Sequence, residues 1–201
     1  MKTILINKKK NDKPKIELTV QRVEASQWSA LGFDKHHYLT HTLNPSAKCL
    51  VFCWGETPVG FIALLNSPRK GMRFGFSVSR LVLSPDFQGL GLSSVILNFC
   101  GGILKSLGDD HPLYIKTIHD KMGGWLTRSD NWQPTSYSGK ERTIESARHD
   151  SHRYRNRFTR TSYCFKYVGE AIYGYEELLL PIKELREKKK EKKIIQLSLF
   201  D

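Results

Sequence analysis

The sequence predicts one mixed α/β domain built around a single sheet, and three observations lead to this fold class. Several short segments have the apolar runs or the two-residue alternation of strands. Segments with helical spacing lie between them, and no internal repeat divides the chain. A length of 201 residues suits one domain with tails and allows a sizeable core without disulfide or metal support.

The first half of the chain predicts a strand, a short helical region and a hairpin. Apolar and polar side chains alternate over residues 16–22, as in a half-buried strand. Residues 26–43 combine aromatic residues, histidines and leucines at helical spacing, which predicts one or two short helices. Residues 49–54 and 59–65 are apolar and are separated by a Gly-Glu-Thr-Pro turn, so they predict a β-hairpin.

The second half centres on a strand, a glycine-rich turn and a helix. Phe76–Leu83 is strand-like and is followed by Ser84-Pro85-Asp86. The apolar stretch 95–107 predicts a buried helix, although Gly101 and Gly102 lower its helix propensity. Three further elements follow this helix: a strand at 113–118, a short helix at 121–128 and a last strand at 162–168.

The ends of the chain differ from this central domain. We expect a basic N-terminal arm at 1–15, the domain at 16–180, a charged tether at 181–194 and a terminal peptide at 195–201. The apolar run at 59–65 is too short to cross a bilayer, and the start lacks the pattern of a secretory signal. Four scattered cysteines fit a reduced compartment, so the sequence predicts a cytoplasmic protein without membrane association.

Charge is the most informative part of the composition. Thirty-two basic and twenty acidic side chains give a net charge of +12. Residues 183–201 hold seven of the basic and four of the acidic side chains, so the rest of the chain keeps +9. A basic body is expected of a protein that works beside a polyanion. A basic protein without such a partner remains the alternative.

The turn after Phe76–Leu83 has the composition of an anion site. Gly89 and Gly91 allow the backbone to approach a ligand, and the following helix directs its first amides toward a phosphate or pyrophosphate. A tight strand–helix turn that binds nothing is the alternative. A Walker loop is excluded because the turn lacks lysine, and a Rossmann fingerprint is excluded because Ser94 occupies the third glycine position.

The residues Gln88-x-x-Gly91-x-Ser93 after this strand resemble motif A of the GNAT acyltransferases. The resemblance extends to Val59-Gly60-Phe61 and to Tyr114-Ile115-Lys116-Thr117, and it covers roughly residues 16–168. It implies a mostly antiparallel sheet flanked by helices, and acetyl-CoA or another acyl-CoA as donor. It also implies that the backbone at Leu81, Val82 and Leu83 holds the pantetheine arm. The pyrophosphate would lie on Gln88, Gly89, Leu90, Gly91, Leu92 and Ser93.

The sequence departs from ordinary acetyltransferases at two places. Many members of the family have a tyrosine in the helix here expected at 121–128, and a glutamate where Ser79-Arg80 stand. We therefore consider other catalytic candidates, which are His37, Tyr38, Arg80 and Asp120. A histidine near neutrality suits a general base. Arg80 is either salt-bridged or a substrate contact, and His119-Asp120 either positions an amine or caps a helix.

Two histidines and two cysteines allow either metal binding or ordinary burial. His37 and His41 have the i, i+4 spacing of a ligand pair, with Cys49 and Cys53 nearby in sequence. Both cysteines lie in a predicted strand, so we interpret them as buried thiols and expect no metal site.

Two features point to DNA. His37-Tyr38, Arg80 and the basic composition are similar to the phage Mom-type DNA-modifying proteins of the GNAT fold. Residues 148–163 combine arginines and aromatic rings, which suit phosphate contacts and base stacking, although a solvated loop is equally consistent. The nucleic-acid-binding candidates are Arg148, Arg153, Tyr154, Arg155, Arg157 and Arg160.

The terminal peptide resembles the segment by which bacterial DNA-processing proteins bind the β sliding clamp. Its apolar anchors and its glutamine would be Gln196, Leu197, Leu199 and Phe200. An amphipathic strand on the protein's own sheet is the alternative. Together these features predict a bacterial or phage acyltransferase that acts on DNA or DNA-bound targets. An ordinary N-acetyltransferase and a degenerate adaptor for DNA and clamp remain open.

Overall fold

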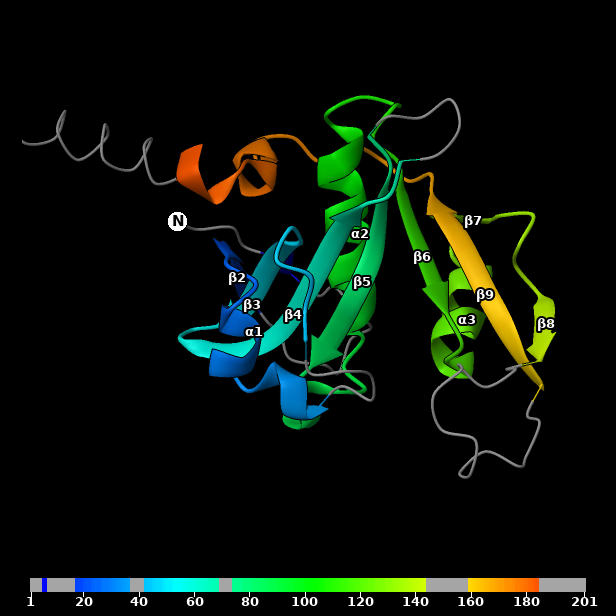
Figure 1. Ribbon diagram of the computed structural model, residues 1–201, viewed down its shortest axis with the longest axis horizontal. Helices are drawn as coiled ribbons and strands as arrows, with labels where there is room; N and C mark the ends of the chain where they lie inside the picture. The colour runs from blue at the N-terminus through cyan, green and yellow to red at the C-terminus, as the bar shows by residue number, and fades with distance from the viewer. Residues whose placement is uncertain (1–4, 7–16, 37–41, 69–73, 144–158, 185–201) are drawn as a thin grey trace, which may run out of the picture.

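A computed structural model describes residues 5–6, 17–36, 42–68, 74–143 and 159–184. One mixed sheet organises them, with strand order β1-β2-β3-β4-β5-β6-β9-β7 and with β8 beside β9 (Figure 1). The strands are β1 Leu5–Ile6, β2 Glu17–Val23, β3 Lys48–Trp54, β4 Thr57–Asn66, β5 Phe76–Leu83, β6 Leu113–Thr117, β7 Trp132–Pro134, β8 Lys140–Thr143 and β9 Thr159–Tyr167.

The helices are short except for one. Two α-helices carry most of the packing, namely α2 at Leu92–Lys105 and α3 at Asp120–Thr127, and α1 spans only Gln27–Ala30. Three 3-10 turns complete the fold: η1 Phe33–His36, η2 Pro85–Phe87 and η3 Glu176–Leu179. No helix in the described ranges is both long and apolar enough to span a bilayer.

The mostly antiparallel sheet predicted from the resemblance is confirmed. Of the strand pairs among the described residues, only β5 with β6 is parallel. That parallel pairing covers two positions, Phe76 with Leu113 and Ser77 with Tyr114. Beyond these positions β5 continues to pair with β4 and β6 continues to pair with β9, so the two central strands diverge (Figure 1).

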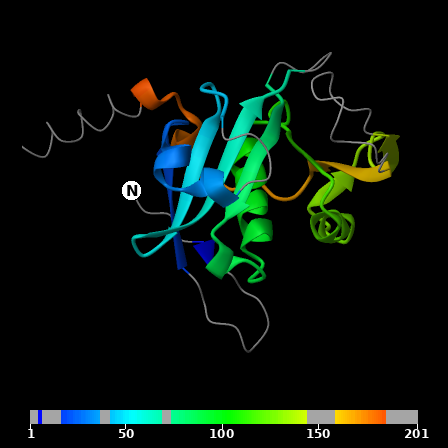
Figure 2. The same cartoon turned by 60° about the horizontal axis from the view of Figure 1, so that its bottom comes forward.

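The sheet separates two apolar clusters. The larger one lies between the sheet and α2, where Ile96, Phe99 and Ile103 are buried against the strands. The smaller one lies on the opposite face, where Trp28 of α1 and Phe33 of η1 pack on Phe61 of β4. Figures 1 and 2 show α1 and α2 on opposite faces of the same strands. We call these the α2 face and the α1 face.

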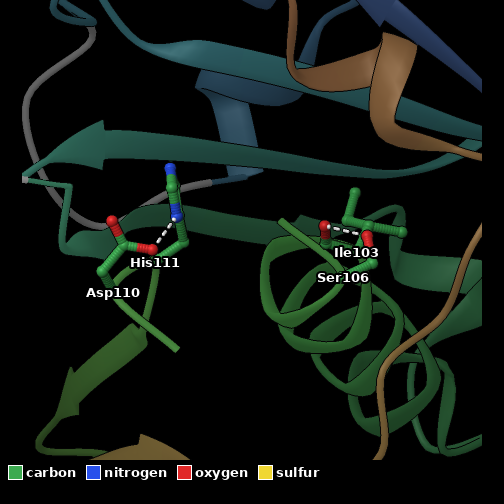
Figure 3. A network of polar contacts seen from close by, with 4 residues as sticks. All are labelled: Ile103, Ser106, Asp110 and His111. Carbon is green, nitrogen blue, oxygen red and sulfur yellow. Dashed lines mark hydrogen bonds and ion pairs between the residues drawn. The ribbon is translucent and has the colours of Figure 1, made fainter. Parts of the chain in front are cut away.

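Two glycines that weaken the predicted helix have a packing role in α2. A Cβ atom on Gly101 would lie 2.3 Å from the ring of Tyr167, and one on Gly102 would lie 2.5 Å from Ile172. These glycines therefore let β9 and the chain after it approach the helix closely. Past its C-terminal end, Ser106 donates to the carbonyl of Ile103 at 2.9 Å (Figure 3).

The loop that leads from α2 into β6 carries a short contact between a histidine and an aspartate. His111 Nδ1 lies 2.7 Å from the carboxylate of Asp110 (Figure 3). The ring of His111 stacks on that of Phe74, with centroids 4.9 Å apart. Phe74 lies two residues before β5, so this contact joins the segments that lead into the two parallel strands. It holds them together at the end opposite to their divergence.

The predicted strands and helices are present, with boundaries shifted by a few residues. The strand predicted at 16–22 is β2, the hairpin is β3 with β4, and the helices predicted at 95–107 and 121–128 are α2 and α3. The structure adds short strands that sequence patterns did not predict: β1, β7 and β8. Within the predicted N-terminal arm, Leu5 and Ile6 pair with Leu18 and Glu17 of β2.

Candidate functional site

The end of β5 is anchored to the start of β4, and this anchor positions the glycine turn. The backbone amide of Ser84 donates to Val59 O at 3.0 Å, and the Ser84 hydroxyl donates to Pro58 O at the same distance. After η2, the Gln88 side-chain amide donates back to Leu83 O at 3.2 Å. The chain therefore turns sharply from the strand toward α2.

The predicted glycine turn forms a cradle at the start of α2. Gly89 and Gly91 have φ angles of 78° and 80°, which side chains rarely adopt. Open space lies where a Cβ atom of Gly89 would stand. Gly91 is the N-cap of α2, and no side chain of the described residues caps the helix.

Electrostatics at this helix end favour an anion. The first turn of α2 contains no acidic residue, and its leading residues are Leu92 and Ser93. The first amides of a helix lack intrahelical acceptors, and the helix dipole adds positive potential there. A phosphate-sized anion supplies the missing acceptors. The residues of this cradle therefore fit the pyrophosphate of a nucleotide cofactor.

A strand edge leads into the cradle. Leu81, Val82 and Leu83 pair with β4 on one side, and β6 does not pair with them on the other. Their side chains belong to the two apolar clusters, with Val82 5% and Leu83 7% exposed. The part of these residues that remains available to a ligand is therefore the backbone edge, which suits an extended amide-containing chain.

A β-bulge precedes this edge. Ala63 faces Arg80 and Leu64 faces Val78, so Ser79 has no opposite residue on β4. Arg80 follows the bulge, is half-buried, and donates from Nη1 to Ser79 O at 2.8 Å. Its register partner Ala63 belongs to the α1-face cluster, so Arg80 lies on that face.

Asp120 lies at the other side of the divergence, as the first residue of α3. Its Oδ1 accepts a hydrogen bond from the Tyr163 hydroxyl at 3.3 Å; Asp120 is exposed and Tyr163 is half-buried. His119 is the N-cap of α3, because its Nδ1 accepts from the Met122 amide at 3.4 Å. Of the two interpretations of His119-Asp120, capping therefore applies to the histidine.

Several predicted residues lie outside the described part of the chain. These are His37 and Tyr38, the arginine-rich residues Arg148, Arg153, Tyr154, Arg155 and Arg157, and the terminal residues Gln196, Leu197, Leu199 and Phe200. Arg160 is described by its backbone, which pairs with Arg142. The roles assigned to them stay predictions.

Three of the four cysteines are buried free thiols. Cys49, Cys53 and Cys100 are free and buried, as predicted for the first two. Burial raises the pKa of Cys49 to about 11, and the nearby Arg22 offsets only part of this effect. Burial also raises the pKa values of Cys53 and Cys100. Within the described ranges, no group of three His, Cys, Asp or Glu residues could hold a metal ion.

Two features of the site were not found from the sequence. Trp54 at the end of β3 is 53% exposed, and its ring lies 5.9 Å from that of Phe87, just before Gln88. The ring of Tyr163 on β9 packs against Gly123 of α3, and its hydroxyl donates to Asp120. Both depend on contacts between distant segments. For the contact between Trp54 and Phe87, the only local signal was a tryptophan directly before a Gly-Glu turn.

The chain is similar to known proteins in its structure but not detectably in its sequence. No family model matches the chain, and no curated protein matches its sequence. An IAA acetyltransferase from Bacillus cereus superposes with a TM-score of 0.55 at 12% identity, over 75% of this chain and 98% of the other. Naa50 from Arabidopsis thaliana, in complex with the bisubstrate analogue CoA-Ac-MVNAL, superposes with a TM-score of 0.54 at 12% identity, over 76% and 99%.

A GNAT-family acetyltransferase from Streptococcus pneumoniae is similar to the same degree. Its TM-score is 0.53 at 12% identity, over 76% of this chain and the whole of the other. The protein has the GNAT fold of these acetyltransferases.

Proposed function

We propose that the protein transfers an acyl group from acetyl-CoA or another acyl-CoA to an amine. The observation that carries this proposal is the start of α2, which has no side-chain cap within the described part of the chain. It follows two glycines with positive φ and the end of β5, where that strand has diverged from β6. Proteins of the same fold support the choice of donor, because they are named acetyltransferases and one was solved with a CoA-containing analogue.

The donor would be held by backbone groups. Gln88, Gly89, Leu90, Gly91, Leu92 and Ser93 would surround the pyrophosphate at the start of α2. The edge of β5 at Leu81, Val82 and Leu83 would bind the amides of the pantetheine arm. Backbone recognition of this kind requires a particular chain path more than particular side chains. It therefore tolerates Ser93 where the family often has a glycine or alanine.

The transfer itself needs an oriented amine and proton movement. The amine nitrogen attacks the thioester carbonyl carbon, the carbon–sulfur bond breaks, and coenzyme A leaves as a thiolate that takes up one proton to become the thiol. The amine loses one proton, so the reaction is balanced without a further reactant. Orientation supplies much of the rate in such a reaction. His37, Tyr38, Arg80 and Asp120 are the proposed residues for proton transfer and carbonyl polarisation.

The acceptor is proposed to be DNA or a DNA-bound target. The net charge of +9 outside the C-terminal segment supports it, together with the similarity to Mom-type proteins at Arg80. In this proposal the terminal residues 195–201 recruit the protein to the β sliding clamp. A base amine would have to be reached in single-stranded DNA or after base flipping.

Isothermal titration with acetyl-CoA tests the donor site. Gly91→Asp places a carboxylate at the anion cradle, whereas the neutral Gly91→Asn has nearly the same size and tolerates positive φ. We expect the wild type and Gly91→Asn to bind acetyl-CoA. Gly91→Asp should bind acetyl-CoA at least about tenfold more weakly than the wild type, because the added carboxylate and the pyrophosphate are like charges in one site. A wild type that binds neither acetyl-CoA nor coenzyme A contradicts the donor assignment.

Mass spectrometry of nucleosides tests the acceptor. DNA from cells that express the protein is digested and compared with DNA from cells expressing Gly91→Asp. A new adduct absent from the control supports modification of DNA, and its mass identifies the group. An unchanged profile with expressed protein favours an ordinary N-acetyltransferase, which should turn over amines without DNA and should not need residues 195–201. An adaptor would keep its biological role in Gly91→Asp.

A further inference from the structure

The α1 face of the sheet beyond β5 carries positive charge. Leu113 and Ile115 of β6 belong to the α2-face cluster. Side chains alternate along a strand, so Tyr114 and Lys116 lie on the opposite, α1 face. On β9, Phe165 and Tyr167 belong to the same α2-face cluster, which places Lys166 on the α1 face. Lys116, whose register partner is Cys164, and Lys166 are therefore near neighbours on adjacent strands.

Two more cations lie on this face. Lys140 of β8 pairs with Ser162, which lies four residues before Lys166 on β9 and therefore on the same face of the sheet. Lys140 thus lies on that face as well. Arg80 of β5 lies on this face through its partner Ala63. We define Arg80, Lys116, Lys140 and Lys166 as the basic face. They come from β5, β6, β8 and β9, so the charge extends across the sheet from the divergence to its edge (Figure 1).

Negative charge is missing from the strand positions of this face. Its described members on the three strands from β5 to β9 are Ser77, Arg80, Val82, Tyr114, Lys116, Ser162, Cys164 and Lys166, and none is acidic. Lys116, Lys140 and Lys166 form no ion pair with any carboxylate in the described part of the chain. The three lysines therefore repel one another and favour an external polyanion.

An aromatic ring accompanies the lysines. Tyr137, in the turn between β7 and β8, is 54% exposed, and Lys140 Nζ lies 5.1 Å from its ring centroid. The turn is fixed to β9, since the Ser138 hydroxyl accepts from the Cys164 amide and the Gly139 amide donates to Ser162 O. The ring is therefore presented by a hydrogen-bonded turn. A fixed exposed tyrosine beside lysines suits stacking on an unpaired base.

We propose that the basic face binds single-stranded nucleic acid, with Lys116, Lys140 and Lys166 on phosphates and Tyr137 against a base. This proposal rests on the proposed function and names the substrate class of the same site, because Arg80 joins the basic face to the divergence of β5 and β6. Nucleic acid is favoured over an acidic protein because the face combines evenly spread cations with an aromatic ring and offers few apolar side chains to a protein partner.

Fluorescence anisotropy with a labelled single-stranded DNA tests the charges. The variant Lys116→Glu/Lys166→Glu is compared with Lys121→Glu/Lys183→Glu, which has the same net charge on exposed positions away from this face. We expect the first variant to bind at least tenfold more weakly than the second. Loss of two phosphate contacts also removes part of the salt dependence. Raising salt from about 50 to about 200 mM should weaken the wild type about sevenfold more than the first variant.

The tyrosine is tested by its matched pair of variants. Tyr137→Phe keeps the ring and should bind the oligonucleotide as tightly as the wild type does. Tyr137→Ala should bind it at least about fivefold more weakly. A duplex of the same sequence should bind more weakly than the single strand. RNA of the same sequence distinguishes the two nucleic acids, and preference for either one supports the proposal.

Three results would overturn the inference. They are equal binding by the two charge-reversal variants, equal loss in Tyr137→Phe and Tyr137→Ala, and displacement of the oligonucleotide by poly-glutamate at equal charge concentration. Thermal unfolding monitored by circular dichroism verifies that each variant is folded. Acetyl-CoA titrations of the same proteins keep the two proposals separate. A protein that binds DNA through this face but never acetyl-CoA refutes the proposed function alone.

Discussion

The ring of Tyr167 lies directly against the backbone of Gly101, so that a Cβ atom on this glycine would stand 2.3 Å from the tyrosine Cγ. Gly101 lies inside α2, where glycine lowers helix stability by about 1 kcal/mol relative to alanine. The close approach of β9 to the helix outweighs this local cost. Helix propensity and tertiary packing thus favour opposite residues at one position.

Gly101→Ala should therefore destabilise the protein. Tyr167 is 6% exposed and its hydroxyl is held by Glu170 O at 3.0 Å, so the ring cannot easily move away. We expect a loss of about 1–3 kcal/mol in the free energy of unfolding, from overpacking. Urea unfolding measures it. The control is Gly124→Ala in α3, where the nearest atom is Nη1 of Arg128 at 3.4 Å, and a gain of about 0.5–1 kcal/mol is expected. A stabilised Gly101→Ala would contradict the packing.

Removal of one acceptor beneath β7 should also be costly. Trp132 is 3% exposed, and its Nε1 donates to Asn98 Oδ1 of α2 at 2.8 Å. Asn98→Ala leaves that buried donor without its partner, which should cost about 1–3 kcal/mol in urea unfolding. In a Trp132→Phe background the same change should cost little, because the donor is gone. Equal costs in both backgrounds would show that the hydrogen bond does not stabilise the fold.

Alkaline pH should weaken the fold through Cys49. Burial raises the pKa of this thiol from 9.0 to about 11 in the folded state. A raised folded-state pKa means that the contribution to stability is complete below pH 9 and is lost as pH rises through about 11. The maximum loss is about 2–3 kcal/mol. Urea unfolding at pH 8 and pH 10 should show a smaller decline for Cys49→Ala, and parallel declines would refute the assignment.

Trp54 should report binding at the glycine turn. Its ring is 53% exposed and contacts Phe87, which precedes the cradle residues by a single position. We expect acetyl-CoA to change tryptophan fluorescence, because ordering of the turn alters the surroundings of this exposed indole. Trp54→Phe should abolish most of the change while titration calorimetry still detects binding. A signal that persists in Trp54→Phe would assign it to another of the four tryptophans.

Local patterns predicted the elements that depend on local chemistry. Phe76–Leu83 was expected with its observed boundaries, since an apolar run ends there at Ser84-Pro85. The helix after the turn begins at Leu92 rather than at residue 95, because Gly91 in the left-handed region serves as its N-cap. The strands β7 and β8 were missed because they are only three and four residues long, and they exist through their pairing with β9.

The candidate site divides in the same way. The glycine turn and the start of α2 behind it were predictable, because backbone freedom and a helix start are encoded in consecutive residues. The bulge at Ser79 was not, since it is a mismatch between the registers of β4 and β5. The hydrogen bond from Tyr163 to Asp120 joins residues 43 positions apart. The predictions for His37, Tyr38 and the terminal peptide still await a test.

The sequence by itself determined the order of the longer elements, the glycine turn and the basic composition of this protein, because each follows from residue type and short-range spacing. The tertiary structure decided where β5 and β6 part, and which face of the sheet carries Arg80, Lys116 and Lys166. Strand pairing selects a register among distant segments, and a shift of one residue reverses every side chain. For that reason the sequence indicates a positive charge, whereas only the folded sheet gathers it on one face.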